Sequence, residues 1–494
     1  MDTKNTLHRR EVDNLNFLSI DIGASNGKAF IISHNGEKIK VKEILRFPNV
    51  PIEINGFTYW NILEIYRNVF ASIKMAVEKY DAVSVGIDTW GVDFGLLDES
   101  GFLVGFPLHY RNAFKWDAME KTLDLVGKEW IFERCPTQFQ PFNTLYQIVG
   151  MRDKGFKAVD FAKTLLGVPS LLVYFLTGKK FMEFTFATTT QIYNPILNDW
   201  DPDITERLNI PKILPKIVKP ATIVDDIKLF GKRIKVVFPA THDTGSAFAC
   251  VNERDSMIIS TGTWFLDGIL VEEPVKNRKV MEFNFANEGC VDGKYRLLSN
   301  STGMWIVEGL RSKWENMAYR DLIEMAKKAK PFSGMIDVDS DELQSTDDME
   351  ESISKGSMRF AKKPLESKGE IVRTAFEGIA FKTRLVKERL EEVANVKLRK
   401  VRMLGGATRN ELVCQFVSNA TNLPVEAGPV EATAIGNGLA QMVACGELSF
   451  NELPEIVERS FQIKRYEPEN VGEWETAYAN WNEKVIKQQR IDGE

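Results

Sequence analysis

The feature that most constrains the fold of this 494-residue chain is a pair of strand–turn–strand segments, one in each half. In the first half, the apolar runs 17–21 and 29–33 flank a glycine-rich turn at residues 23–27. In the second half, the apolar runs 257–260 and 264–271 flank a Thr-Gly-Thr turn. Apolar runs bounded by such turns are typical of β-hairpins. The sequence therefore predicts a hairpin with a small, polar turn in each half.

The elements after each hairpin come in a similar order. In the first half, residues 38–45 alternate like a third strand, residues 62–77 have helical spacing, and residues 82–88 return to a strand. In the second half, a long helical pattern over 372–393 is followed by a strand at 401–404. Antiparallel strands, a crossover helix and a parallel strand make one α/β unit. We therefore predict an α/β plan that is used twice.

This repeated order divides the chain into two domains. We predict a polar tail at residues 1–16, an N-terminal domain at 17–248 and a C-terminal domain at 249–485. A chain of this length has room for two domains of ordinary size. Residues 332–368 are rich in Asp, Glu, Ser and Lys, with little periodicity, and are interpreted as a surface insertion.

Composition argues against several classes of function. The chain has 63 Lys plus Arg against 69 Asp plus Glu, a net charge of −6, and no basic block, so we expect no nucleic-acid partner. Five scattered cysteines and four histidines indicate a reduced compartment. The N-terminus lacks a signal peptide's apolar core, and the most apolar stretch, 165–176, is too short to span a bilayer. We expect a cytoplasmic protein that binds small molecules and no membrane.

The turn of the first hairpin has the composition of a phosphate-binding loop. Gly23 and Gly27 allow backbone N–H groups to approach an anion, and Ser25 and Asn26 lie between them. Asp21 ends the strand and is free to hold Mg²⁺ directly or through water. A polar hairpin turn without a ligand explains the same residues equally well. Two such hairpins, each opening one half, are more informative than either alone.

Other common nucleotide and metal motifs do not occur in the sequence. There is no G-x-x-x-x-G-K-[ST], no G-x-G-x-x-G opening a helix and no H-E-x-x-H. Gly405 and Gly406 instead follow a strand and precede a helical run, where a base or a phosphate can lie against the backbone. A tight strand-to-helix turn without a ligand is the alternative.

Two segments with carboxylates follow predicted strands. The first, Thr241-His242-Asp243-Thr244, offers a carboxylate that can take a proton from an attacking hydroxyl, an effect worth ~10²–10⁴ in rate. An N-cap Asp beside a structural His is the alternative. The second, at residues 88–93, combines two Asp with a Trp and a Gly, which is the composition of a sugar site. Aromatic core packing explains it equally well.

In this order and spacing, the segments resemble the FGGY carbohydrate kinases, and within that family the rhamnulokinase branch most closely. The resemblance extends from about Phe17 to about Phe450. Its most specific strings are DIGASNGK, GIDTWGVDFGLLD, NTLYQ, THDTGSAFA, STGTW, NEGCVDGKYRLLSNSTGMW and AGPVEATAIGN. The resemblance implies two ribonuclease-H-like domains of the actin/hexokinase type around a cleft that holds MgATP and a sugar. It also implies that the two domains close on each other during catalysis.

The resemblance further implies roles for single residues. Asp243 would be the general base that takes the proton from a sugar hydroxyl, which then attacks the γ-phosphate of ATP. Asp21 is the expected Mg²⁺ ligand. The expected substrate-binding residues are Trp90, Gly91, His242, Thr244 and Asn300. The expected ATP-binding residues are Ala24, Ser25, Asn26, Gly27, Lys28, Thr263, Glu308 and Gly406.

The implied activity is transfer of the γ-phosphate of ATP to the C1 hydroxyl of a ketose. L-Rhamnulose is the first candidate, and L-fuculose or a pentulose are the alternatives within the same chemistry. From a different class, a non-catalytic actin-like sensor that binds ATP is the alternative. The presence of Asp243 together with both phosphate hairpins argues against such a sensor.

Four positions depart from the rhamnulokinase pattern. Glu308 replaces the usual Gln on the nucleotide side, and an added negative charge near ATP is unfavourable unless a cation compensates. Asn112 and Ser170 each stand where Asp is usual, and residues 186–188 replace a more polar string. The last three lie in the first domain, where the family binds its sugar, so they bear on which sugar is used.

Overall fold

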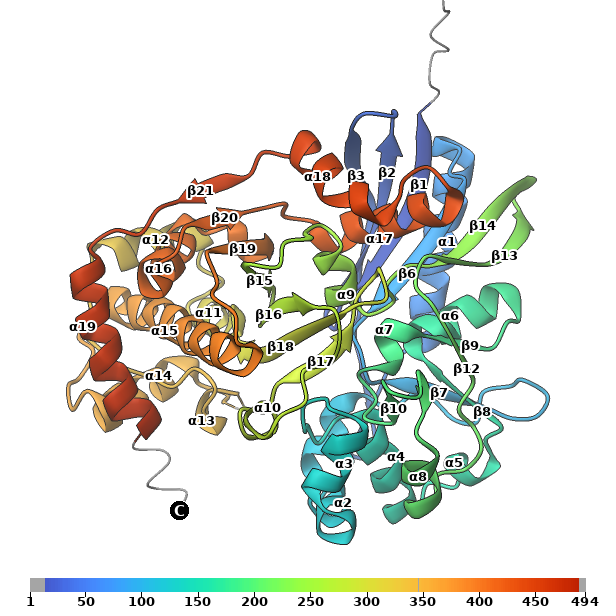
Figure 1. Ribbon diagram of the computed structural model, residues 1–494, viewed down its shortest axis with the longest axis horizontal. Coiled ribbons are helices and arrows are strands. Elements are labelled where there is room, and N and C mark those ends of the chain that lie inside the picture. Colours follow the sequence, from blue (N-terminus) through green and yellow to red (C-terminus); the bar gives the residue numbers. More distant parts are fainter. Residues whose placement is uncertain (1–13, 345, 488–494) are drawn as a thin grey trace, which may run out of the picture.

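The computed structural model of the protein describes residues 14–344 and 346–487. Two β-sheets form its framework, one from each half of the chain, with helices packed around them (Figure 1). Most of the predicted N-terminal tail, residues 1–13, lies outside the described residues, and the first strand begins at Leu15. The predicted α/β fold class is confirmed.

The first sheet has six strands in the order β13-β14-β6-β1-β2-β3. As the sequence predicts, β1 pairs antiparallel with β2 and parallel with β6, which follows the crossover helix α1 (Ile62–Tyr80). Asn61 caps this helix by accepting a hydrogen bond from Glu64 N–H, and the buried apolar residues of α1 lie at helical spacing. The strands are β1 Leu15–Ile22, β2 Asn26–His34, β3 Ile39–Pro48, β6 Ser84–Thr89, β13 Thr222–Leu229 and β14 Lys232–Phe238.

The second sheet has seven strands in the order β17-β18-β16-β15-β19-β20-β21. Here β15 pairs antiparallel with β16 and parallel with β19, so this sheet repeats the relation of β1 to β2 and β6. The predicted reuse of one plan is therefore visible in the strand pairing. The strands are β15 Ser256–Thr261, β16 Trp264–Val271, β17 Ala286–Gly289, β18 Tyr295–Thr302, β19 Lys400–Gly405, β20 Val425–Ala427 and β21 Lys464–Tyr466.

A helix from the second half covers the first sheet. Helix α17 (Ala432–Cys445) packs against β1, β2 and β6, and it crosses α9 (Asp243–Phe248), the helix that follows the first sheet. One buried cluster contains Phe17 and Phe30 of the first sheet, Phe248 of α9 and Leu439 of α17. The domain boundary at residues 248/249 stays a prediction, because α17 follows that boundary in sequence but packs on the first sheet.

The remaining elements of the first half lie mostly between β6 and β13 and build a subdomain beside the first sheet (Figure 1). Its helices are α2 Ala118–Val126, α3 Lys128–Arg134, α4 Thr144–Asp153, α5 Ala158–Phe161, α6 Val168–Thr177, α7 Phe184–Ala187 and α8 Pro202–Arg207, with the 3₁₀ turn η1 Tyr110–Lys115. Its short strands are β7 Phe94–Leu97, β8 Thr164–Gly167, β9 Phe181–Glu183, β10 Tyr193–Asn194, β11 Asp199–Trp200 and β12 Lys216–Val218. The hairpin β4 (Ile52–Ile54) and β5 (Phe57–Tyr59) precedes α1.

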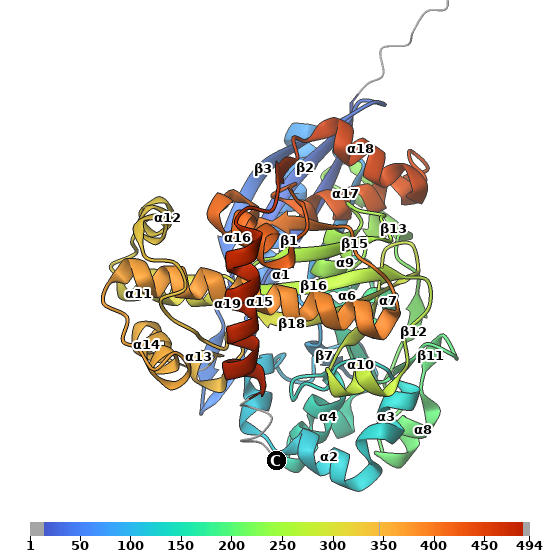
Figure 2. The ribbon, with the colours of Figure 1, turned by 60° about the vertical axis from the view of Figure 1, so that its left-hand side comes forward.

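Most helices of the second half pack around the second sheet, whereas α17 and α18 pack against strands of the first sheet. Besides α17, the helices of this half are α10 Arg278–Glu282, α11 Trp305–Lys313, α12 Tyr319–Lys328, α13 Asp341–Gln344, α14 Met349–Phe360, α15 Lys368–Ala394, α16 Glu411–Thr421, α18 Leu453–Ser460 and α19 Val471–Trp481, with the short turns η2 Gly406–Arg409, η3 Phe450–Glu452 and η4 Asn482–Lys487. The central helix is α15, and α19 lies across it (Figure 2). The Phe381 ring packs on the rings of Trp474 and Trp481 at this crossing.

The interpretation of residues 332–368 as a surface insertion is wrong in part. This segment contains α13 and α14, and Met349, Ile353 and Phe360 of α14 are buried in the main core. Their helical spacing is hidden among many charged residues, so composition alone misses the apolar face.

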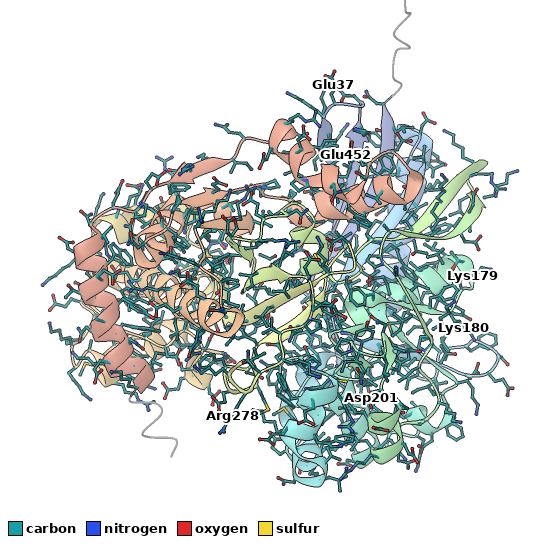
Figure 3. The ribbon with its side chains drawn as sticks, viewed as in Figure 1. Glu37, Lys179, Lys180, Asp201, Arg278 and Glu452 are labelled. Carbon is teal, nitrogen blue, oxygen red and sulfur yellow. The ribbon has the colours of Figure 1, made fainter. Side chains whose placement is uncertain are left out.

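Charged side chains such as Lys179, Arg278 and Glu452 are exposed at the outer surface (Figure 3). Within residues 14–344 and 346–487, no helix has the length and apolar character needed to cross a membrane.

Candidate active site

Three carboxylates meet where β1 and β6 end and α9 begins. Asp21 and Asp88 are register partners on the parallel strands β1 and β6, and Asp243 is the first residue of α9. Burial, followed by the charge of Asp243, raises the pKa of Asp21 to about 7. Burial and the charge of Asp21 raise the pKa of Asp88 well above its usual range. Carboxylates that disfavour each other's ionisation in this way are stabilised by a cation.

The surroundings of Asp21 and Asp88 fit Mg²⁺. Asn437 of α17 donates to Asp88 Oδ2 at 2.5 Å, whereas the buried Asp88 Oδ1 has no partner among the described residues. Mg²⁺ prefers hard oxygen ligands and is usually held by one or two carboxylates together with waters and substrate phosphates. In the described part of the chain, no three His, Cys, Asp or Glu side chains form a ready metal cage. Asp21 and Asp88 match the arrangement in which two carboxylates hold the ion together with waters and phosphates. Sequence reasoning assigned Asp21 as a Mg²⁺ ligand but did not assign Asp88.

The first phosphate hairpin is closed by its own backbone and by Asn49. Gly23 N–H donates to Asn26 O at 2.9 Å, and Asn49 N–H donates to Ser25 O at 3.0 Å. The ring of Phe47 lies 2.2 Å from the place where a Cβ of Gly27 would be. The structure therefore gives Gly27 a packing role under the hairpin, in addition to the backbone access that the sequence suggests.

A chain of ion pairs connects this hairpin to the second half. Lys28 Nζ lies 3.0 Å from Glu431 Oε2, just before α17. Glu431 Oε1 in turn lies 3.7 Å from Arg409 Nη2, at the end of the η2 turn that begins with Gly406. Residues more than 370 positions apart in sequence are thereby brought to one place, and Lys28 and Gly406 lie on the same side of the site.

The second phosphate hairpin lies next to Gly406. Thr261 and Gly405 are register partners on β15 and β19, and Thr261 Oγ1 accepts a hydrogen bond from Ala407 N–H at 3.1 Å. Thr263 is exposed in the hairpin turn, and its carbonyl accepts from Trp305 N–H at 3.1 Å. The predicted ATP residues Thr263 and Gly406 therefore lie on adjoining loops of the second sheet.

Glu308 lies on α11, which begins beside this second hairpin. Its carboxylate accepts hydrogen bonds from Arg311 Nη1 at 2.8 Å and from the Tyr319 hydroxyl. The negative charge of Glu308, which stands where Gln is usual, is therefore compensated by Arg311, three residues later on the same helix. The side chain is 47% exposed, so the ion pair is partly screened by solvent.

The predicted sugar residues gather on the other side of Asp243. Thr89 N–H donates to Thr241 O at 2.9 Å, and this contact brings the segment before α9 alongside the end of β6. A Cβ at Gly91 would lie 3.4 Å from His242 Nε2, so Gly91 and His242 are neighbours. Thr244 donates to Asp243 Oδ1 through its N–H at 2.6 Å and through its hydroxyl at 3.1 Å.

The predicted sugar residue Asn300 lies on the second sheet. It lies on β18, four residues after Arg296, which contacts His242, so the two side chains share one face of the strand. Asn300 Oδ1 is buried and has no partner among the described residues. A buried amide oxygen without a partner is costly unless a ligand or water satisfies it.

Asp93 organises an aromatic wall that sequence reasoning found only in part. Its carboxylate accepts hydrogen bonds from the indole N–H groups of Trp60 at 2.6 Å and Trp90 at 3.0 Å, and from Gln147 at 2.9 Å. The ring of Trp60 stacks between those of Trp90 and His109, with centroids 4.0 and 4.1 Å away. Burial raises the pKa of Asp93 to about 7, and the hydrogen bonds oppose this shift. The motif containing Trp90 pointed to this wall, but Trp60 carries no local signal.

Glu183 holds the segment before the base and was also missed. Its buried carboxylate accepts from Thr241 N–H at 2.9 Å, from the Thr241 hydroxyl at 2.7 Å and from Thr185 N–H at 2.8 Å. Thr185 Oγ1 in turn accepts from His242 N–H at 3.1 Å. These bonds fix the backbone from which Asp243 projects.

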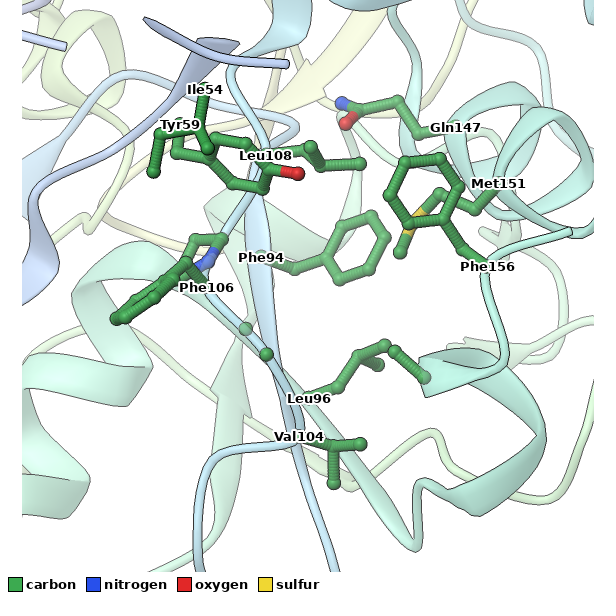
Figure 4. A pocket seen from close by; sticks show the side chains of 14 residues that line it. Ile54, Tyr59, Phe94, Leu96, Val104, Phe106, Leu108, Gln147, Met151 and Phe156 are labelled. Atoms are coloured by element: carbon green, nitrogen blue, oxygen red, sulfur yellow. The ribbon is translucent and has the colours of Figure 1, made fainter. Parts of the chain in front are cut away.

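A separate cavity of about 290 Å³ lies between α4 and the loop after β7 (Figure 4). Its wall is mainly apolar, with Phe94, Leu108 and Phe156 among the lining side chains. Gln147, which lines this cavity, also donates to Asp93. The described residues that line it carry no charge, so we place no phosphate chemistry there.

Comparisons with known proteins show the family of this chain. The model of the N-terminal domain of the FGGY family of carbohydrate kinases matches residues 16–246, and the model of the C-terminal domain matches residues 257–445. A rhamnulokinase of Bacteroides thetaiotaomicron is 34% identical over 477 residues, which is 94% of this chain and 98% of the relative. A rhamnulokinase of Oceanobacillus iheyensis is 33% identical over 91% of this chain and 97% of the relative.

Solved structures share the fold at low sequence identity. A xylulose kinase of Lactobacillus acidophilus aligns with a TM-score of 0.79 at 17% identity, covering 95% of this chain and 97% of that one. A glycerol kinase of Plasmodium falciparum with ADP aligns with a TM-score of 0.78 at 17% identity, covering 96% and 98%. The resemblance drawn from the motifs and the actin/hexokinase-type fold that it implied are both confirmed.

Proposed function

The chain belongs to the FGGY family of carbohydrate kinases and is an ATP-dependent sugar kinase, and we propose that it phosphorylates L-rhamnulose at the C1 hydroxyl. The relatives described as rhamnulokinases support this sugar, because they match this chain over nearly their whole length. The site residues support the chemistry. The observation that carries the proposal is the position of Asp243 between the phosphate hairpin and the sugar residues.

Asp243 lies near residues proposed for the phosphates and near residues proposed for the sugar. On the phosphate side, burial and then the charge of Asp243 raise the pKa of the Asp21 carboxyl, so the two carboxylates interact. On the sugar side, Asp243 Oδ1 lies 3.4 Å from His242 Nε2. The side chain of Asp243 is 31% exposed, so it is accessible to a substrate. A carboxylate in this place can take the proton of a sugar hydroxyl while the oxygen of that hydroxyl attacks phosphorus.

The other residues then have defined tasks. The first hairpin and Lys28 bind and orient the phosphates, while Thr263, Glu308 and Gly406 lie on the nucleotide side. Trp90, Gly91, His242, Thr244 and Asn300 orient the sugar. Asp21, with Asp88 beside it, would hold Mg²⁺, which neutralises phosphate charge when bound. As the C1 oxygen bonds to the γ-phosphorus, the bond to the β,γ-bridging oxygen breaks, ADP leaves and Asp243 keeps the proton.

The departures from the family pattern in the first domain support an unchanged sugar pocket. Ser170 is buried in α6 against Met182, with Oγ 3.9 Å from Sδ, and Phe186 is fully buried beneath Gly167. Asn112 donates to Thr58 O at 2.7 Å and so ties η1 to β5. These side chains have partners inside the protein, so their identities follow from packing. L-Fuculose or a pentulose remains the alternative substrate.

The test is an assay of ADP release with MgATP and a panel of sugars. The panel contains L-rhamnulose, L-fuculose, L-xylulose, D-xylulose, L-ribulose and glycerol. We expect turnover on L-rhamnulose that is lost in Asp243→Asn. Asp203→Asn is the matched control, because Asp203 also lies in the first turn of a short helix but is exposed and pairs with Arg134, which is not one of the proposed site residues. Turnover on another sugar alone would refute the proposed substrate, and turnover in Asp243→Asn would refute the base.

A further inference from the structure

A buried ion pair from the second sheet reaches His242, which precedes the proposed base. Arg296 of β18 is fully buried, and its Nη2 lies 2.7 Å from Glu288 Oε2. Glu288 is the register partner of Arg296 on β17. The same Nη2 lies 2.6 Å from His242 Nδ1. Residues of the second sheet therefore contact a residue that follows the first sheet.

Arg296 is held beneath the first turn of α9. A Cβ at Gly245 would lie 2.9 Å from Arg296 Nη1, and the guanidinium carbon lies 5.7 Å from the centre of the Phe248 ring. Gly245 and Phe248 both belong to α9, the helix that begins with Asp243. The guanidinium thus lies between Glu288 on one side and α9 on the other.

This contact decides which nitrogen of His242 carries the proton. An arginine side chain only donates hydrogen bonds, because it stays protonated in proteins. His242 Nδ1 at 2.6 Å must therefore accept, since an N–H there would point at the N–H of Arg296. A neutral ring with Nδ1 as acceptor carries its proton on Nε2. His242 Nε2 lies 3.4 Å from Asp243 Oδ1.

We propose that Arg296 and Glu288 are positioning residues that set the tautomer of His242, so that Nε2–H points at the proposed base. The inference rests on the proposed role of Asp243. With Thr244 N–H and the Thr244 hydroxyl also donating to Oδ1, the contacts of Asp243 fall on one oxygen. Oδ2 has no hydrogen-bond partner among the described residues and is left to take the proton of the sugar hydroxyl.

Loss of the Arg296 guanidinium reverses this arrangement. Glu288 Oε2 lies 3.3 Å from His242 Nδ1, so without Arg296 the carboxylate attracts a proton to Nδ1. In the neutral ring, Nε2 then becomes an acceptor that faces the Asp243 carboxylate. We expect the reactive geometry to be lost while the nucleotide site, which lies on other loops, is unchanged. In kinetic terms, kcat falls and KM for ATP stays constant.

The first experiment reads the proton on the wild-type enzyme and needs no turnover. The chain has four histidines, so selective ¹⁵N labelling of histidine gives few signals, and His242→Gln identifies the signal of His242. Two-bond ¹H–¹⁵N spectra at neutral pH distinguish the two neutral tautomers from the charged ring. We expect the neutral tautomer with the proton on Nε2. A proton on Nδ1, or on both nitrogens, overturns the inference even if the proposed sugar is right.

The second experiment measures kinetics in Arg296→Met and Arg296→Lys, on whichever sugar of the panel turns over. Arg296→Met should move the His242 proton to Nδ1 and lower kcat by about tenfold or more, with KM for ATP constant. Arg296→Lys keeps a charged donor and should restore both the tautomer and most of kcat. Loss of kcat with an unchanged tautomer means that Arg296 acts only through packing and overturns the inference. If Arg296→Met does not fold, the wild-type spectrum and Arg296→Lys still decide.

A matched control is the exposed pair of Arg254 and Glu272, whose charged atoms lie 2.5 Å apart in the same half of the chain. Arg254→Met also removes an arginine from an ion pair, but this pair lies outside the site residues. We expect its kcat and its His242 spectrum to match those of the wild type. A failure of the proposed substrate appears as inactivity of the wild type on L-rhamnulose, and it leaves the tautomer measurement unaffected.

Discussion

The crossing of α9 and α17 leaves no room for a side chain at Gly436. A Cβ there would lie 1.8 Å from Ser246 O, whereas real Cβ contacts are not shorter than 3.0 Å. Gly436→Ala must therefore separate the two helices by roughly 1.2 Å, because the obstacle is a backbone carbonyl that cannot rotate away. Ser246 lies one turn after Asp243 on α9, so the movement reaches the proposed base.

The magnitude follows from this displacement. A shift of about 1 Å in a catalytic group can cost ~10²-fold in rate, so we expect kcat of Gly436→Ala to fall by about that factor. Overpacking costs ~1–3 kcal/mol in the free energy of unfolding, of which up to ~1 kcal/mol is offset because alanine favours a helix more than glycine does. The variant should therefore fold and be nearly inactive.

The assay combines ADP-release kinetics with urea unfolding. Gly472→Ala in α19 is the matched control, because its Cβ would meet nothing within 4 Å. We expect this control to keep its kcat and to gain slight stability. A Cβ at Gly438, on the same helix as Gly436, would lie 2.6 Å from Cγ1 of Ile32 on β2, so Gly438→Ala pushes α17 against β2 instead of α9 and its effect on kcat should be smaller. Gly436→Ala with the kcat of the wild type would refute the reasoning that this crossing sets the position of the base.

Three further predictions follow from the charged groups. Because the pKa of Asp21 is raised to about 7, protons compete with Mg²⁺ for this carboxylate below that pH. As the pH is lowered, the apparent affinity for MgADP measured by calorimetry should fall by up to about tenfold per pH unit. An affinity that does not change with pH would contradict this prediction. Burial and the charge of Asp339 raise the pKa of Asp267 to about 7, so its stabilising effect is present at low pH and lost as pH rises from about 4 to 7. Between pH 5 and 7 the free energy of unfolding should fall by ~2 kcal/mol more in the wild type than in Asp267→Asn, and equal slopes in urea titrations would refute the assignment. Arg311→Gln should leave the charge of Glu308 uncompensated and raise KM for ATP by up to about fivefold. Adding Glu308→Gln in a double variant should return KM to the wild-type value. An unchanged KM in Arg311→Gln would mean that this charge does not act on ATP.

The local elements of both halves could be predicted from the sequence. Alternating and helical apolar patterns, together with glycine-rich turns, gave both hairpins, α1, α15 and the parallel strands β6 and β19. Asp21 and Asp243 were found for the same reason, since each stands where a strand ends or a helix begins. These signals act over a few residues, through side-chain alternation and turn chemistry.

The tertiary structure decided which distant residues meet. Asn437 donates to Asp88, Lys28 pairs with Glu431, and Arg296 reaches His242, although these residues are far apart in the chain. No periodicity marks such pairs, because each partner is an ordinary polar residue in its own element. Only the packing of α17 across the first sheet and of β18 beneath α9 brings these groups together, and it removes Asp88 and Arg296 from water, so that their partners become energetically necessary. The sequence thus determined the elements and the main chemical groups, and long-range packing determined how those groups are oriented and charged.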